Sequence, residues 1–280
     1  MMNDESFIVH HSSFIIRFML RGAIFDLGST LIHNEYDNQW ALLRPRLIAD
    51  LVTDLQAQGL AFSPAALAAA FNQNLADFDD QRQTHFKEIT TEYTLRTTFS
   101  QLGIAAEGLD LPRALSAYFA FSEQSWRPMP HVHQTLATLH ARGLKLAIVS
   151  NAADEANVQR LIDRHALRLY FDPIIVSAAA GVRKPNPRIF QPVIKSWGFQ
   201  PSEIVMIGDT LGADVLGAKN AGFKSVWVTM QADTPGNIAH RETILPDAIV
   251  SSLDDLPGVI ERIQETEYRS QNNAPPLSDL

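Results

Sequence analysis

The chain has 280 residues, of which 46% are hydrophobic and 19% are charged, and it carries a formal net charge of -8 with a sequence pI of about 5.6. This composition is typical of a globular protein with one large domain or two small ones, and its acidic balance argues against nucleic acid as a partner. The absence of cysteine excludes disulfides, thiolate nucleophiles and cysteine-bound zinc and fits a cytoplasmic location, and no apolar run reaches the roughly 18 residues that would span a membrane.

Residues 1–19 do not fit the pattern of the rest of the chain. They contain two short apolar stretches, separated by the polar residues 10–13, and they lack the basic leader and the cleavage site of a signal peptide. Met19 stands just before the first predicted strand. We therefore interpret residues 1–19 as an N-terminal extension that results from a mis-assigned start, with translation beginning at Met19.

The first predicted strand is the apolar run Ala23–Phe25, which is typical of a strand buried on both faces of a parallel sheet. Asp26 follows where this strand ends, and ligands of open α/β sheets bind at the carboxyl ends of the strands. The turn at Gly28, Ser29 and Thr30 offers backbone N–H groups that can bind an anion. Asp26 is therefore a candidate nucleophile toward a phosphoryl group, although an aspartate that only caps a turn shows the same pattern.

Residues 35–127 have helical spacing and little strand character. Leucines recur every three or four residues from Leu43 to Leu55, and Ser63-Pro64 has the pattern of an N-cap followed by a first helical residue. Two more helices are expected over residues 91–102 and 111–121. We interpret the segment as an all-helical cap inserted after the first strand, because both of its ends join the chain close to that strand and the next helix. The alternative is a helical domain unrelated to the site.

Strands and helices alternate in the rest of the chain. Apolar runs predict strands over residues 144–149, 173–177, 204–207, 225–229 and 247–250. Helices are expected over residues 131–142, 154–166, 183–197, 213–221 and 253–263. This alternation predicts an α/β fold with a doubly wound parallel sheet. The boundaries that follow are an α/β core over residues 20–34 and 128–268, a helical cap over 35–127 and a flexible tail over 269–280.

Polar side chains stand at the ends of several of these elements. Asp26, Ser150 and Asp209 come after predicted strands, Lys184 lies at the start of a helix, and Asp214 lies in the first turn of another. Each one alone also fits a turn residue, a surface lysine or an acid favoured by a helix dipole. Together they are candidates for one site, because the carboxyl ends of parallel strands lie along the same edge of a sheet.

In this order the segments resemble the motifs of the haloacid dehalogenase-like (HAD) hydrolase superfamily. The resemblance covers about residues 20–263 and rests on Phe25–Leu31, Ile148–Asn151, Gly181–Pro187 and Ile207–Asp214. The helical insertion after the first motif is similar to the superfamily's type 1 cap. The resemblance implies a Rossmann-like core and an enzyme with hydrolase activity.

The resemblance also implies roles for the motif residues. Asp26 would attack phosphorus and form an aspartyl-phosphate, and Lys184 would neutralise charge beside it. Mg²⁺ would be the cofactor, held by Asp26, the backbone carbonyl of Gly28 and Asp209. Asp214 would complete the metal site directly or through water.

The same resemblance implies how a substrate is bound. Lys184, Ser150, Asn151 and the backbone around Leu27 and Gly28 would contact the phosphoryl oxygens, and the Ser150 hydroxyl would also assist catalysis as charge shifts. The expected partner is a small phosphorylated molecule that the cap selects, because the core handles only the phosphoryl group. The protein itself is expected to be a monomer or a homodimer.

One position departs from the phosphatases of this superfamily. They carry a second aspartate two residues after the nucleophile, which protonates the leaving group and then activates water, whereas this chain has Gly28 there. A positioned general acid or base is worth about 10²–10⁴-fold in rate. Three hypotheses about function therefore stay open.

The favoured hypothesis is a Mg²⁺-dependent phosphatase-type hydrolase that acts through an aspartyl-enzyme intermediate. Its substrate would have a good leaving group, or a proton donor such as His33 or Glu35 would replace the missing aspartate. A second hypothesis is a dehalogenase- or phosphonatase-like hydrolase. A dehalogenase would not need the apparent metal site, and a phosphonatase would need Lys87 as a Schiff-base lysine. The third hypothesis is a catalytically weak binding protein.

Overall fold

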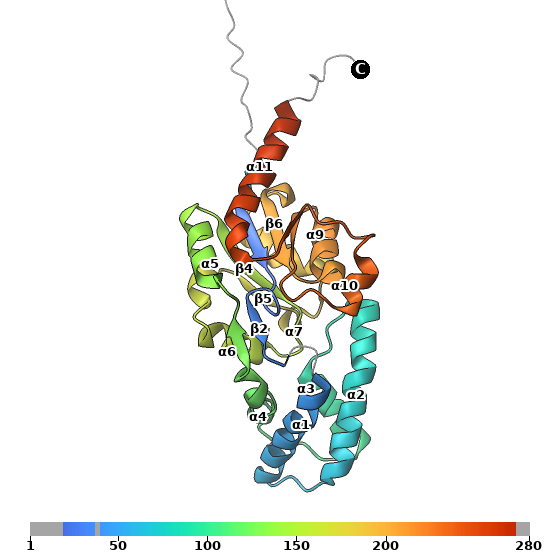
Figure 1. The fold of residues 1–280 in the computed structure, drawn as a ribbon. Coiled ribbons are helices and arrows are strands. Elements are labelled where there is room, and N and C mark those ends of the chain that lie inside the picture. Colours follow the sequence, from blue (N-terminus) through green and yellow to red (C-terminus); the bar gives the residue numbers. More distant parts are fainter. Residues whose placement is uncertain (1–18, 37–39, 273–280) are drawn as a thin grey trace, which may run out of the picture.

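Every apolar run that predicts a strand forms one in the computed structural model, which describes residues 19–36 and 40–272. Six of the described strands make one parallel sheet in the order β5-β4-β1-β6-β7-β8. The strands are β1 (Gly22–Phe25), β4 (Lys145–Ser150), β5 (Ile174–Val176), β6 (Ile204–Gly208), β7 (Lys224–Val228) and β8 (Ala248–Val250). The predicted doubly wound α/β fold is thereby confirmed (Figure 1).

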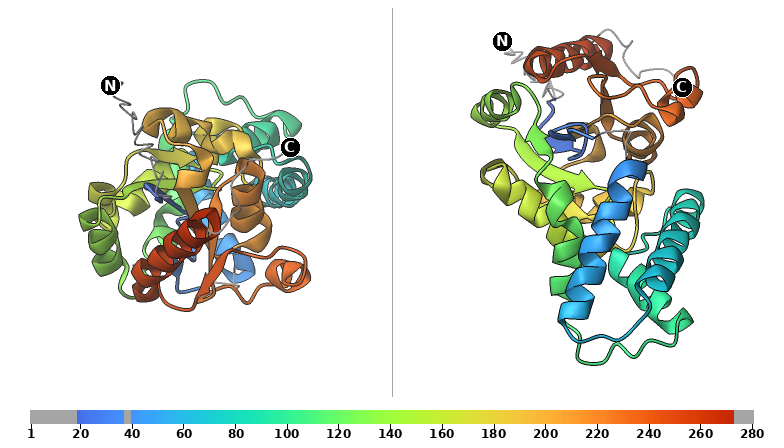
Figure 2. Two further views of the ribbon diagram at one scale, coloured as in Figure 1. Left: turned by 90° about the horizontal axis from the view of Figure 1, so that it is seen from above. Right: turned by 60° about the horizontal axis from the view of Figure 1, so that its bottom comes forward.

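Helices cover both faces of this sheet, because side chains that alternate along each strand point to opposite sides. Phe25, Ile148 and Ile207 belong to one apolar cluster, which includes residues of α5 (Val132–Ala141), α6 (Glu155–Arg164) and α11 (Leu256–Asn272). Ile24 and Met206 belong to a second cluster on the other face, with residues of α8 (Gln191–Trp197) and α9 (Leu216–Ala221). The sheet and the helices on its two faces form three layers (Figure 2). Within the sheet, the strand order places β1 near the middle.

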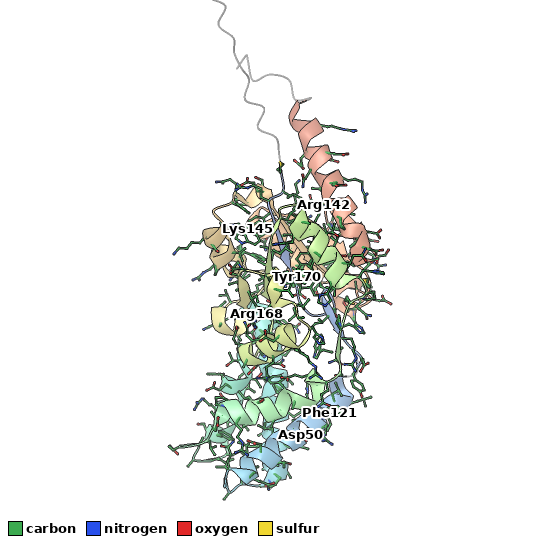
Figure 3. All side chains as sticks on the ribbon, turned by 90° about the vertical axis from the view of Figure 1, so that its left-hand side faces the viewer. Asp50, Phe121, Arg142, Lys145, Arg168 and Tyr170 are labelled. Atoms are coloured by element: carbon green, nitrogen blue, oxygen red, sulfur yellow. The ribbon has the colours of Figure 1, made fainter. Side chains whose placement is uncertain are left out.

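The segment between β1 and α5 forms a helical body at one end of the core, which we call the cap (Figure 1). Its helices are α1 (Trp40–Ala57), α2 (Pro64–His85), α3 (Thr91–Gln101) and α4 (Leu111–Glu123). They enclose an apolar cluster of their own, in which Leu51, Phe71 and Phe99 are almost fully buried. As the sequence predicts, Ser63 caps α2 by accepting a hydrogen bond from the Ala66 N–H at 3.4 Å. In Figure 3, Asp50 and Phe121 lie in the cap, whereas Arg142 and Lys145 lie in the core at the opposite end.

A short antiparallel ribbon joins the cap to the core. Its strands are β2 (Ile32–Asn34) and β3 (Trp126–Pro128), which pair Asn34 with Trp126 and Ile32 with Pro128. These strands were not expected from the sequence, since three residues are too few to show a period of two. The ribbon brings the segments that enter and leave the cap side by side above the end of β1.

Several element boundaries differ from the prediction. Residues 183–186 form a loop, and a 3-10 turn begins only at Pro187, because Asn186 accepts a hydrogen bond from the Arg188 N–H at 3.1 Å and so caps that turn. A π-helical turn (Leu211–Val215) precedes α9, and the short helices α7 (Ser177–Ala180) and α10 (Pro235–His240) are additional. The last helix, α11, continues past residue 268 to Asn272, so part of the segment expected as a flexible tail is helical.

Two expectations fall outside the described residues: the interpretation of residues 1–18 as a start-site extension and the flexibility of residues 273–280. None of the helices in residues 19–36 and 40–272 combines the length and the apolar composition that crossing a membrane requires.

Candidate active site

Three buried carboxylates meet at the carboxyl edge of the sheet. Asp26 directly follows β1 and Asp209 directly follows β6, and these two strands are paired with Phe25 opposite Ile207. Asp214 lies in the π-helical turn that comes after Asp209. Each of the three offers one carboxylate oxygen within 4.8 Å of the others. The pairing of two strands that are far apart in the sequence thus creates a cluster of acids, Asp26, Asp209 and Asp214, that we call the carboxylate triad.

Lys184 binds two members of the triad. Its Nζ atom lies 2.5 Å from Asp26 Oδ1 and 2.7 Å from Asp214 Oδ1, and its side chain is almost fully buried. The Asn151 side chain holds the backbone of Lys184 from both sides: the Lys184 N–H donates to Asn151 Oδ1 at 2.8 Å, and Asn151 Nδ2 donates to the Lys184 carbonyl at 3.0 Å. The side-chain amide of Asn151 therefore helps to position Lys184, while Asn151 also lines the cavity described below.

Asp209 and Asp214 accept further hydrogen bonds. The hydroxyl of Thr30 donates to Asp209 Oδ1 at 3.2 Å, and the Thr210 N–H donates to Asp214 Oδ2 at 2.9 Å. Glycine is required at position 208, because a Cβ atom there would lie 2.3 Å from Asp214 Cγ. The Gly208-Asp209 pair in the sequence therefore places one acid and leaves room for the other.

Burial and crowding change the acidity of these groups. Burial raises the pKa of Asp26 to about 6, against the opposing attraction of Lys184, and the Asp214 carboxylate adds to the rise. Burial also raises the pKa of Asp209 well above its usual range, with further contributions from Asp214 and Asp26. For Lys184, burial acts to lower the pKa, but the two neighbouring carboxylates outweigh it and raise the pKa. The metal-free triad thus holds more negative charge than Lys184 compensates.

This excess of buried negative charge fits a divalent cation. Three carboxylates face one ammonium group, and Mg²⁺ prefers carboxylate oxygens completed by water and substrate phosphate. Asp26, Asp209 and Asp214 are the side chains that would hold it, and Gly28 lines the same cavity. The residues present therefore fit the expected cofactor.

The turn after Asp26 differs from the expected anion-binding loop. The Ser29 N–H donates to the Ile32 carbonyl at 2.7 Å, so it is not available to an anion, and Ser29 has a positive φ of 57°. The Leu27 N–H contributes a hydrogen bond to the Asp26 carboxylate. Leu27 and Gly28 both line the cavity above the triad. The part of the expectation that concerned Ser29 was wrong, because the turn closes on itself.

A cavity of about 440 Å³ opens over the triad. All of the residues that the motifs suggested line it, including Ser150 at the end of β4. The lining residues that the motifs did not suggest include Arg183, Asn157 on α6 and Trp126 on β3. Arg183 could have been suggested by its position next to Lys184. Nothing in the sequence around Trp126 suggests a role in the site, since only the pairing of β2 with β3 brings it close to Gly28.

Other candidates from the sequence lie elsewhere. Glu35 pairs with Arg127 at 3.1 Å on the ribbon, and neither it nor His33 is among the described residues that line the cavity. Lys87 is exposed, and its backbone bridges to Val182. No proton donor from these positions faces the triad in the described structure.

An α/β sheet with an acidic cluster at the ends of its central strands and a helical cap above them defines a HAD-type hydrolase. A family model described as haloacid dehalogenase-like hydrolase matches residues 20–222. The chain belongs to this family and is a hydrolase.

Known proteins of similar sequence and fold extend over most of the chain. A glyceraldehyde 3-phosphate phosphatase of Methanothermobacter thermautotrophicus is 26% identical over 240 residues, which is 85% of this chain and 97% of that protein. Haloacid dehalogenase-like hydrolase domain-containing protein 3 of Bos taurus is 28% identical over 262 residues, covering 90% and 98% of the two chains. The crystal structure of a 2-haloacid dehalogenase from Pseudomonas syringae pv. Tomato DC3000 matches with a TM-score of 0.60 at 23% identity, over 88% of this chain and 100% of that chain. At this identity the structural match establishes the fold alone.

Proposed function

We propose that this hydrolase is a Mg²⁺-dependent phosphatase that acts on a small phosphorylated metabolite through an aspartyl-phosphate at Asp26. The observation that carries the proposal is the buried triad of Asp26, Asp209 and Asp214, which shares Lys184 in one open cavity. The similarity to a protein named glyceraldehyde 3-phosphate phosphatase supports the reaction type. It does not select the substrate.

In the proposed reaction Asp26 is the nucleophile. Lys184 favours the ionised form of the Asp26 carboxyl group and so opposes the effect of burial on its pKa. Lys184 would also attract a phosphoryl oxygen of the substrate. The Ser150 hydroxyl lines the cavity at the end of β4 and would bind another oxygen, while Asn151 keeps Lys184 in place. Mg²⁺, held by the triad, would supply the positive charge that lets an anionic carboxylate and a phosphate approach each other.

The other hypotheses from the sequence have less support. A metal-independent dehalogenase would have no use for three clustered carboxylates, since one nucleophile suffices for it. A phosphonatase would need Lys87 in the cavity, but this lysine is exposed on the cap and does not line the cavity. A binding protein would not need a lysine that keeps the nucleophile ionised.

Phosphate release from a panel of phosphorylated metabolites, measured with and without Mg²⁺, tests the proposal. We expect Mg²⁺-dependent turnover that Asp26→Asn lowers more than about 10³-fold, as is typical when a nucleophile is removed. The matched control is Asp233→Asn, which makes the same chemical change at an exposed aspartate and should leave the rate unaltered.

Three results would contradict the phosphatase. Turnover of the panel that does not depend on Asp26 would exclude it as the nucleophile. Metal-independent halide release from 2-haloacids would indicate a dehalogenase. No turnover of any ester, combined with thermal stabilisation by a phosphate mimic, would indicate a binding protein.

A further inference from the structure

The cavity above the triad has an apolar side. Ile32, Val158 and Leu161 are buried members of the large core cluster, and Trp126 packs against the same cluster. All four also line the cavity. They come from both strands of the ribbon and from α6, so the wall is built where cap and core meet. A substrate group that extends from the triad toward this wall meets apolar side chains.

Trp126 lies against the backbone that follows the nucleophile. A Cβ atom at Gly28 would be 3.5 Å from Trp126 Cη2 and 3.8 Å from its Cζ3 atom, which is ordinary van der Waals contact. The indole therefore borders the space that a side chain at position 28 would enter. An aromatic side chain in this position favours an aromatic ring on the leaving group, since two rings in offset-stacked or edge-to-face contact gain about 0.5–1.5 kcal/mol beyond the buried area.

The described residues that line this cavity include no group suited to protonate a leaving group. They contain no histidine, glutamate, tyrosine or cysteine, and their acids are the triad itself. The ammonium group of Lys184 is already shared by the carboxylates of Asp26 and Asp214, at 2.5 Å and 2.7 Å. A leaving oxygen must therefore depart as an anion. That is easy for a phenolate and hard for an alkoxide.

We propose that the substrates are aryl phosphates, in which the phosphate is esterified to an acidic hydroxyl group on an aromatic ring. The inference rests on the proposed phosphatase function and names its substrate class. An Asp26 carboxylate oxygen forms a bond to phosphorus, and the bond between phosphorus and the ring oxygen breaks with its electron pair on that oxygen. Water then attacks phosphorus, which releases inorganic phosphate, restores the Asp26 carboxylate and gives the water proton to solvent.

Hydrolysis of three phosphate esters by the Mg²⁺-loaded enzyme separates recognition of the ring from the acidity of the leaving group. Phenyl phosphate and 4-nitrophenyl phosphate share a ring on the ester oxygen, whereas benzyl phosphate keeps the ring but leaves as an alkoxide. We expect kcat/KM to fall steeply from 4-nitrophenyl to phenyl phosphate, and benzyl phosphate to react about 10²–10⁴-fold more slowly than phenyl phosphate, the span that a general acid would supply. Equal rates for benzyl and phenyl phosphate would overturn the inference and leave the phosphatase function standing. If none of the three esters is hydrolysed, the inference fails, and the phosphatase function is then decided by the panel of phosphorylated metabolites.

Two variants test the roles of Gly28 and Trp126 in this inference. Gly28→Asp adds a carboxyl group whose Cβ atom would lie 3.5 Å from Trp126 Cη2, and we expect it to raise the ratio of kcat/KM for benzyl phosphate to kcat/KM for 4-nitrophenyl phosphate at least about tenfold. Trp126→Leu should weaken the binding of phenylphosphonate, measured by calorimetry, by about tenfold, and Trp126→Phe should restore most of it. Binding of methylphosphonate should not change. Equal losses for both phosphonates would show that Trp126 is only structural and would overturn its role.

Discussion

Glu88, in the loop after α2, accepts a hydrogen bond from the Ser177 hydroxyl at the start of α7, with an Oε2–Oγ distance of 2.5 Å. This contact ties the cap to the core at a second place, separate from the β2–β3 ribbon. The Glu88 side chain is 1% exposed, and guanidinium nitrogens of Arg82 and Arg183 lie 3.8 Å from it. Since Arg183 precedes Lys184, this loop of the cap is anchored next to the residue that binds the nucleophile.

Ser177→Ala should therefore destabilise the protein. The change removes the donor to the buried Glu88 carboxylate and the acceptor for the Ala152 N–H, which donates to Ser177 Oγ at 2.9 Å. Leaving a buried group unpaired costs about 1–3 kcal/mol, and we expect this loss in the free energy of unfolding measured with urea. Ser100→Ala, at an exposed position of α3, is the matched control and should stay within about 0.5 kcal/mol of wild type. Equal effects of the two changes would argue against a structural role for the Glu88 contact.

Gly208→Ala should disrupt the triad. The added methyl group would occupy the position of the Asp214 carboxyl group, so this side chain must move away from Lys184. We expect Mg²⁺ affinity, measured by calorimetry, to fall at least about tenfold, because one of three carboxylates is displaced. Gly212→Ala is a suitable control, as its Cβ atom would meet only His240 at 3.6 Å. Unchanged Mg²⁺ affinity in Gly208→Ala would show that Asp214 does not contribute to metal binding.

Asp209→Asn should stabilise the metal-free protein and abolish its response to Mg²⁺. The pKa of Asp209 is raised by burial and by Asp214 and Asp26, which means that its charge is unfavourable in the folded state. Removing that charge should raise the Tm without metal by about 2–4 °C, the shift that corresponds to roughly 1 kcal/mol in a chain of this size. Wild type should gain further stability from Mg²⁺, whereas the variant should not. Differential scanning calorimetry with and without Mg²⁺ measures both effects, and an equal Mg²⁺ response in the two proteins would remove Asp209 from the metal site.

The stability of the metal-free protein should depend on pH through Asp26. Its pKa is raised from 3.8 to about 6 in the folded state, so the folded protein binds more protons than the unfolded chain between these values. The contribution of Asp26 to stability is therefore present at low pH and is lost as pH rises toward 6 and above. Relative to Asp26→Asn, the free energy of unfolding of wild type should fall by about 2 kcal/mol between about pH 4 and about pH 7. A constant difference between the two proteins over this range would contradict the raised pKa.

Much of the core could be read from local patterns. Buried parallel strands are continuous apolar runs, so residues such as Ala23–Phe25 and Ile204–Ile207 identify their strands without knowledge of any partner. The caps at Ser63 and Gly143 mark helix ends for an equally local reason, since a side-chain acceptor and a positive φ are properties of one residue. The segment after Arg183 was misjudged, because Asn186 and Pro187 start a turn later than the motif suggests.

The candidate site was only partly accessible from the sequence. Each acid of the triad follows a recognisable strand or motif, so its residue type and its place at a strand end are local facts. That Asp26 lies beside Asp209 depends on the pairing of β1 with β6, and the commitment of Asn151 to Lys184 depends on a loop returning to the end of β4.

Residue order and composition by themselves determined the α/β class, the positions of the six core strands and the acids that end them, because burial of a strand leaves its mark on consecutive residues. Only the tertiary structure decided that Trp126 lies beside Gly28, that Ser29 closes its own turn and that neither His33 nor Glu35 lines the cavity above the triad. These relationships join segments about a hundred residues apart, or depend on which backbone groups are already paired, and no local pattern records either.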